Sequence, residues 1–168
     1  MKTRIFMGLM FAWAAIGGLQ AESPSKTVAV LYYGNTPVNS DTLHFLDAQA
    51  RAAGYQIFPT QDPRQIQPEK IRAVVLLNTG LDAGIDRRLA GFIGTWEDKQ
   101  RLVLVSLKKG SAAPKVEVLP ASVETLGVDA VAAASRWDGR GLFGGGSDLF
   151  KMHLEWSKQV LAYVGRLP

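Results

Sequence analysis

The sequence contains no cysteine among its 168 residues, so disulfide bridges and thiolate metal ligands cannot stabilise the fold. It contains only two histidines, His44 and His153, which lie far apart along the chain. We therefore expect no transition-metal site, and we find no recognisable catalytic constellation. Stability must come from a packed apolar core, for which a hydrophobic content of 47% is ordinary.

Strong charge of one sign is also lacking. The formal net charge is +4, and no basic run that could mark a polyanion-binding surface is longer than a pair such as Lys108 and Lys109. Aromatic residues do not alternate with basic ones anywhere in the chain. Because nucleic-acid binding needs a clustered basic footprint, we expect no nucleic-acid partner.

The first 21 residues have the three parts of a secretory signal. Lys2 and Arg4 precede an apolar run, and the small residue Ala21 stands before the polar Glu22. This pattern predicts export with cleavage after Ala21. The run is shorter than the ~20 residues that span a bilayer, so we expect no stable membrane insertion. The prediction is a signal peptide over 1–21 and a single domain over 22–168, periplasmic or secreted.

The remaining chain alternates short apolar runs with segments of helical periodicity. We expect strands at Thr27–Tyr33, Tyr55–Phe58, Ala73–Leu77, Leu102–Leu107 and Val128–Ala134. We expect helices at Asp41–Ala53, with Ser40 as its N-cap and Gly54 after its end, at Ile85–Trp96, and at Leu149–Leu167. Val116–Leu119 is expected to be a short extended piece. Pro59 is expected to end the second strand, which suits a sheet edge.

This alternation predicts the fold class. Strands that alternate with helices form right-handed crossovers and a parallel sheet covered on both faces. The buried character of the first strand places it centrally, beside the short second strand. The sequence therefore predicts an α/β doubly wound, five-stranded parallel sheet of strand order 2-1-3-4-5, with helices on both faces.

The loop after the first strand carries a family resemblance. The segment Val30–Leu43 reads Val-Leu-Tyr-Tyr-Gly-Asn-Thr-Pro-Val-Asn-Ser-Asp-Thr-Leu. It resembles the opening of a flavodoxin, which commonly reads tyrosine-glycine-(serine or threonine)-x-threonine-glycine-asparagine-threonine. Gly34 matches the glycine, Asn35 stands for the first hydroxyl residue, Thr36 fills the variable place, and Asn39 and Ser40 match the final pair. The resemblance implies a flavodoxin-like fold and a loop that wraps the phosphate of FMN.

Two residues depart from the flavodoxin pattern. Pro37 replaces the middle threonine and has no N–H to offer a phosphate. Val38 replaces the glycine, where a branched side chain disfavours positive φ and crowds the backbone. The expected cofactor is therefore none, or FMN bound weakly. A polar turn that caps the first helix is the favoured interpretation of the loop.

Loops at the carboxyl ends of the strands supply the candidate binding residues, because ligands of open α/β sheets bind there. These candidates are Asn35, Thr36, Asn39, Ser40, Thr79, Arg136 and Trp137. Solvated loop charges are the favoured interpretation of these positions, and a site for a small anionic or aromatic ligand is the alternative.

Two functions stay open at this point. The first is an exported, non-enzymatic binding or interaction module that has a flavodoxin-like fold and a degenerate cofactor loop. The alternative is an FMN-binding electron-transfer protein of the flavodoxin type. If the chain is an enzyme, the resemblance implies a flavin-dependent oxidoreductase. The oligomeric state is open.

Overall fold

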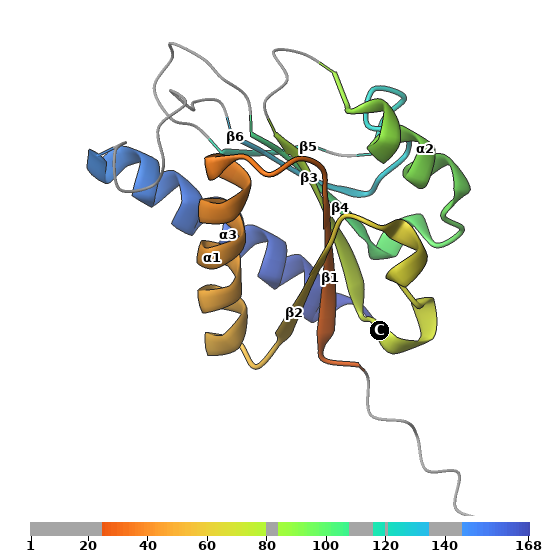
Figure 1. The fold of residues 1–168 in the computed structure, drawn as a ribbon, viewed down its shortest axis with the longest axis horizontal. Helices are drawn as coiled ribbons and strands as arrows, with labels where there is room; N and C mark the ends of the chain where they lie inside the picture. The colour runs from red at the N-terminus through yellow and green to blue at the C-terminus, as the bar shows by residue number, and fades with distance from the viewer. Residues whose placement is uncertain (1–24, 80–83, 108–115, 120, 135–145) are drawn as a thin grey trace, which may run out of the picture.

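The computed structural model arranges the chain as a six-stranded sheet with helices on both faces (Figure 1). It describes residues 25–79, 84–107, 116–119, 121–134 and 146–168. The strands are β1 (Thr27–Tyr32), β2 (Gln56–Thr60), β3 (Ala73–Thr79), β4 (Leu102–Leu107), β5 (Val116–Leu119) and β6 (Ala130–Ala134). The helices are α1 (Pro37–Ala52), α2 (Arg87–Thr95) and α3 (Gly146–Arg166), with 3-10 turns η1 (Pro63–Gln65), η2 (Pro68–Lys70) and η3 (Lys99–Arg101).

The sheet confirms the predicted strand order. Its order is β2-β1-β3-β4-β6-β5, and the first five of these strands pair in parallel. This is the flavodoxin-like 2-1-3-4-5 arrangement, with β6 as the fifth parallel strand. The predicted extended piece, Val116–Leu119, forms a sixth strand that pairs antiparallel with β6.

The second strand is longer than predicted. Pro59 was expected to end it, but β2 continues to Thr60, and Pro59 lies opposite Val30 in the register with β1. Proline is tolerated here because β2 is an edge strand among the strands that the structure describes, so a backbone N–H on its open side can be missing.

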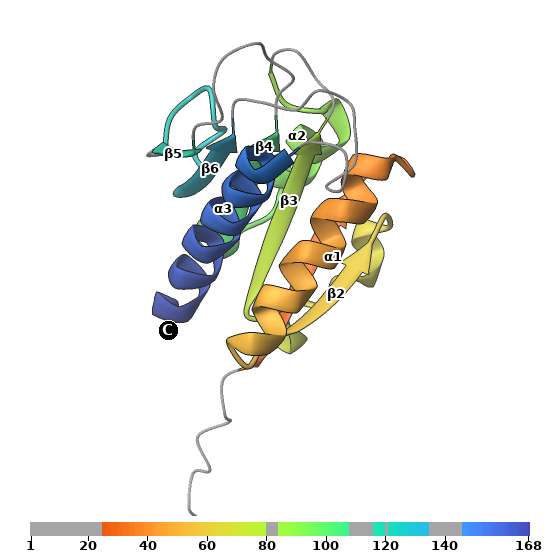
Figure 2. The same cartoon turned by 90° about the vertical axis from the view of Figure 1, so that its left-hand side faces the viewer.

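The central strands are buried on both faces, and alternate residues serve two separate cores. In β1, Val28 and Val30 pack under α1 and α3, whereas Ala29 and Leu31 pack under α2 and the 3-10 turns. Figure 2 shows α1 and α3 side by side on one face of the sheet. Each fully buried side chain of leucine size contributes about 1.5–3 kcal/mol, so both layers are needed to stabilise the sheet.

The first helix begins earlier than predicted. Ser40 was the expected N-cap, but α1 starts at Pro37 and its N-cap is Thr36, whose hydroxyl accepts a hydrogen bond from the Asn39 N–H at 3.2 Å. Proline is favoured in the first helical turn because its missing N–H would have no helical partner there. At the other end, the predicted stop is confirmed, since Gly54 follows the helix with a φ of +81°.

A buried histidine joins α1 and α3. His153 is 3% exposed, and its Nδ1 accepts a hydrogen bond from the Trp156 indole N–H at 2.9 Å. The ring of Phe45 from α1 lies 6.0 Å from the imidazole, measured between centroids. Burial lowers the pKa of His153 to about 4, although the Asp41 carboxylate acts in the opposite direction. The imidazole is therefore neutral and serves as part of the interface between the two helices.

We predict that His153 makes stability fall as the pH drops from 6.5 towards 4. The unfolded chain binds a proton in this window and the folded chain does not, so acid favours unfolding. Full protonation corresponds to a loss of about 3 kcal/mol in the free energy of unfolding. Denaturant titrations at several pH values measure the slope.

The matched variants for this test are His153→Gln and His44→Gln. His44 is exposed on α1, so its replacement should leave the pH dependence unchanged. His153→Gln keeps a hydrogen-bond acceptor for Trp156 but cannot titrate, so it should flatten the slope between pH 6.5 and 4. An equal slope in all three proteins would contradict the prediction.

None of the described helices is both long and apolar enough to cross a bilayer. The predicted signal peptide over 1–21 lies outside the described residues.

Candidate functional site

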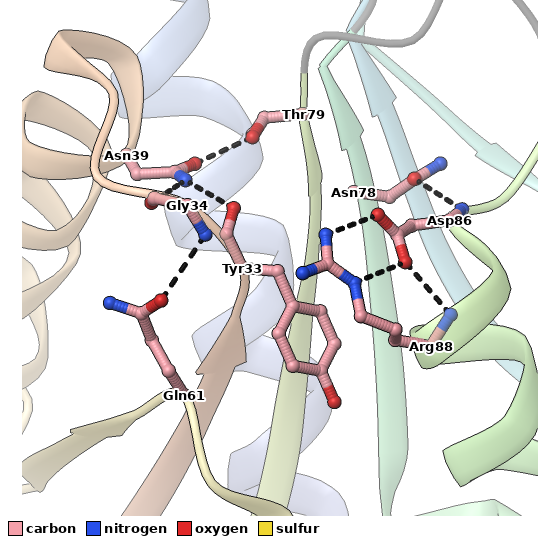
Figure 3. A network of polar contacts seen from close by, with 8 residues as sticks. All are labelled: Tyr33, Gly34, Asn39, Gln61, Asn78, Thr79, Asp86 and Arg88. Carbon is pink, nitrogen blue, oxygen red and sulfur yellow. Dashed lines mark hydrogen bonds and ion pairs between the residues drawn. The ribbon is translucent and has the colours of Figure 1, made fainter.

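The candidate site lies at the carboxyl ends of β1 and β3. The chain leaves β1 towards β2 on one side and later enters β3 on the other, so the strand order reverses between β1 and β3. A crevice at such a reversal is the usual ligand position in open α/β sheets. In this protein the two sides of the reversal are connected by side-chain hydrogen bonds (Figure 3).

Asn39 makes that connection. It is 1% exposed, and its amide nitrogen donates to the carbonyl oxygens of Tyr33 at 3.1 Å and Gly34 at 2.8 Å. Its Oδ1 accepts a hydrogen bond from the Thr79 hydroxyl at 2.5 Å. Asn39 thus holds the loop after β1 in shape and joins it to the end of β3.

The backbone N–H of Gly34, in the loop after β1, is hydrogen-bonded to a side chain that follows β2. Gln61 accepts a hydrogen bond from the Gly34 N–H at 3.2 Å and donates from its amide nitrogen to Asn35 Oδ1 at 2.8 Å. Gly34 has a φ of +84°, a conformation that glycine adopts without strain. Sequence analysis missed Gln61, and its only signal was its place in a loop that leaves a neighbouring strand at the same edge.

The predicted site residues are partly brought together. Four of them, with two apolar neighbours, line an open depression of about 430 Å³ at the start of α1: Tyr32, Asn35, Thr36, Asn39, Ser40 and Leu43. Thr79 joins them through its hydrogen bond to Asn39. Arg136 and Trp137 lie outside the described residues.

A second buried asparagine, which sequence analysis did not single out, organises the end of β3. Asn78 donates to the Ser106 hydroxyl of β4 at 3.1 Å and to the Gly84 carbonyl oxygen at 2.9 Å. Its Oδ1 accepts a hydrogen bond from the Asp86 N–H at 3.1 Å. This residue fixes the approach to α2 relative to the sheet.

An ion pair at the start of α2 borders the site. Asp86 caps the helix by accepting from the Arg88 N–H at 2.8 Å, and its carboxylate also binds the Arg88 guanidinium through two hydrogen bonds, at 3.1 and 2.9 Å. The guanidinium carbon lies 4.2 Å from the centre of the Tyr33 ring. The hydrogen bond from Arg88 lowers the pKa of the Asp86 carboxyl, whereas burial raises the pKa of Tyr33.

The same aspartate-x-arginine arrangement occurs at η1. Asp62 accepts from the Arg64 N–H at 3.1 Å and binds its guanidinium at 2.9 and 2.8 Å. Both pairs follow the carboxyl end of a strand, and in both the arginine charge is balanced by the capping aspartate. Both aspartates therefore cap the local backbone, and the two ion pairs present little net charge to a ligand.

The chemistry of the site is that of hydrogen-bonding amides and hydroxyls. Within the ranges that the structure describes, no group of three histidine, cysteine, aspartate or glutamate residues is placed to hold a metal ion. His153 lies in the interface of α1 and α3 with its Nδ1 engaged by Trp156. No family model and no curated protein matches the chain.

We predict that Thr79→Val destabilises the fold by about 1–3 kcal/mol. Valine keeps the shape of threonine but removes the hydroxyl, which leaves the buried Asn39 Oδ1 without its partner. Denaturant unfolding measures the change. The matched control is Thr95→Val, at an exposed position of α2 where the hydroxyl donates only to carbonyl oxygens of its own helix, and it should stay within about 0.5 kcal/mol. Equal effects at both positions would show that the Asn39–Thr79 bond adds no stability.

Proposed function

We propose that this chain is an exported, non-enzymatic binding or interaction module with a flavodoxin-like fold, in which loop 34–40 has become a structural element. One observation carries the proposal. The groups of this loop that would hold a phosphate already have partners within the chain: the Gly34 N–H binds Gln61, the Asn39 N–H binds Thr36, and the Asn39 side chain binds Thr79.

Anion binding at a helix N-terminus depends on backbone N–H groups that lack a partner. At the start of α1, Pro37 has no N–H, and the N–H of Asn39 is engaged by the cap. Val38 is 3% exposed and packs in the core below the loop. The two departures from the flavodoxin pattern thus have structural roles, because Pro37 starts the helix and Val38 anchors it.

The alternative, an FMN-binding electron-transfer protein, keeps one supporting observation. The open depression of about 430 Å³ beside α1 is lined by the polar side chains of Asn35, Thr36 and Ser40. A phosphate there would have to displace internal hydrogen bonds, so the alternative requires binding energy from elsewhere on the ligand.

We expect the protein to purify without flavin absorbance and to show no saturable quenching of FMN fluorescence at micromolar concentrations. Gln61→Ala releases the Gly34 N–H and should strengthen FMN binding about 3- to 10-fold, which corresponds to one neutral hydrogen bond. Gln67→Ala, at an exposed glutamine outside the loop, should behave like the parent protein. Stoichiometric flavin in the unmodified protein would overturn the module proposal and favour the redox alternative.

Export has its own test. The basic start, the short apolar run and Ala21 support cleavage before Glu22. Mass measurement of protein recovered from the periplasm or medium should give a chain that begins at or near Glu22. A full-length, membrane-bound product would contradict this part of the proposal.

A further inference from the structure

A hydrogen bond in the middle of α3 can be broken by a single proton. His153 Nδ1 accepts the indole N–H of Trp156 at 2.9 Å, and the Trp156 side chain is completely buried. An imidazolium ion carries hydrogen on both ring nitrogens, so it donates hydrogen bonds and accepts none. Protonation of His153 therefore leaves the buried indole N–H without its acceptor, which is unfavourable.

The side of His153 that faces α1 is mainly apolar. The ring of Phe45, which is 7% exposed, lies 6.0 Å from the imidazole, measured between centroids. The Asp41 carboxylate of α1 favours the protonated imidazole, but burial outweighs it and keeps the ring neutral. His44 of α1 is exposed, and Asp47 is held in an ion pair within the same helix.

The strands beneath α3 and the helix itself also offer an imidazolium little. β6 consists of alanine and valine, and the one charged residue of β5 is Glu117. On α3 the charged residues closest to His153 in sequence are Lys151 and Glu155, which are exposed. Both are two positions away, and residues at that spacing do not face each other on a helix. A charged His153 therefore needs water, which it reaches only if this part of the helix leaves α1.

The two parts of α3 are held in different ways. The guanidinium of Arg72 donates to the carbonyl oxygens of Val164, at 2.8 Å, and of Leu167. A cation at this position is favourable because the last carbonyl groups of a helix lack helical partners. The first part contacts α1 through Phe150, which is 50% exposed and whose ring lies 5.3 Å from that of Phe45. The first part can therefore be released while the last part stays in place.

From this arrangement we infer that α3 contains an acid-sensitive switch: protonation of His153 releases residues 146–154 from α1, and residues 156–166 stay packed on the sheet. Release brings the imidazole into water and uncovers Phe45 as an apolar surface. The inference goes beyond the proposed function and uses no residue of loop 34–40, so the two can fail separately.

The size of the response follows from the two environments of the histidine. In the packed helix burial lowers the pKa of His153 to about 4, and in the released segment the pKa returns to the ordinary 6.5. Release therefore takes up a proton, so acid favours it. The opening equilibrium constant should be about 20-fold larger at pH 5 than at pH 7, and about 100-fold larger at pH 4.

The test is native-state hydrogen exchange of the full chain, followed by NMR at low denaturant concentrations and corrected for the intrinsic pH dependence of exchange. Amides of 150–154 should exchange through an opening that hardly depends on denaturant, because it exposes little surface. Amides of 160–165 should exchange only on global unfolding, with a strong denaturant dependence. Equal protection and equal denaturant dependence in the two parts would overturn the inference.

A second measurement needs no variant. The indole hydrogen of Trp156 should exchange with the same opening constant and the same pH dependence as the amides of 150–154, because release of His153 removes its acceptor. An indole hydrogen that stays protected while these amides exchange would show that the opening does not break this bond, and the switch would be excluded.

The acid response is assigned to one residue by a pair of variants. His153→Gln offers an acceptor to Trp156 but does not titrate, so 150–154 should be equally protected at pH 5 and pH 7. His44→Gln, at an exposed position of α1, should keep the response of about 20-fold. A response that persists in His153→Gln would mean that another group drives the release, which contradicts the inference.

Arg72→Gln tests what holds the last part. Loss of the hydrogen bonds from the guanidinium should lower the protection of 160–165 about 10-fold and leave the acid response of 150–154 unchanged. Arg87→Gln removes the same charge from an exposed position of α2 and should behave like the parent protein. Unchanged protection of 160–165 in Arg72→Gln would contradict the division of α3 into two separately held parts.

Discussion

The central constraint on this fold is that its middle strands carry apolar side chains on both faces. Residues of β1, β3 and β4 alternate between two cores, one beneath α1 and α3 and the other beneath α2 and the 3-10 turns. Exposing either core would lose the free energy of apolar burial. The chain has no disulfide bridge that could compensate for this loss. Polar groups at the strand ends must then be satisfied close to these cores, which explains the buried asparagines Asn39 and Asn78.

The strand order and the two-layer arrangement could be predicted from the sequence because they follow from local patterns. The continuous apolar run of β1 indicates a strand that is buried on both faces, and the proline in β2 indicates an edge. The predicted start of α1 was about one turn too late, because Ser40 and Thr36 are both suitable N-cap residues. Pro37 favours Thr36 as the cap, since proline is enriched at the first position of a helix.

The contacts of the candidate site were less predictable, because they join residues that are distant in sequence. Gln61 binds Gly34 across neighbouring loops, and Thr79 binds Asn39 across the reversal of strand order. Neither pair leaves a pattern in the sequence. The pairs Asp62–Arg64 and Asp86–Arg88 are local, and their repeated aspartate-x-arginine spacing would have been sufficient to suggest them. Resemblance to a flavodoxin loop drew attention to segment 34–40, but Pro37 and Val38 acquire a structural meaning only when the helix start is known.

The proline of β2 also affects how the sheet meets other molecules. An outer strand with a regular row of N–H and C=O groups is a template on which a second chain can extend the sheet. Pro59 interrupts that row, because it has no N–H to donate, and the strand at the opposite border, β5, has only 4 residues. Both borders therefore resist the addition of strands from another copy, which protects the native protein against ordered aggregation at high local concentration.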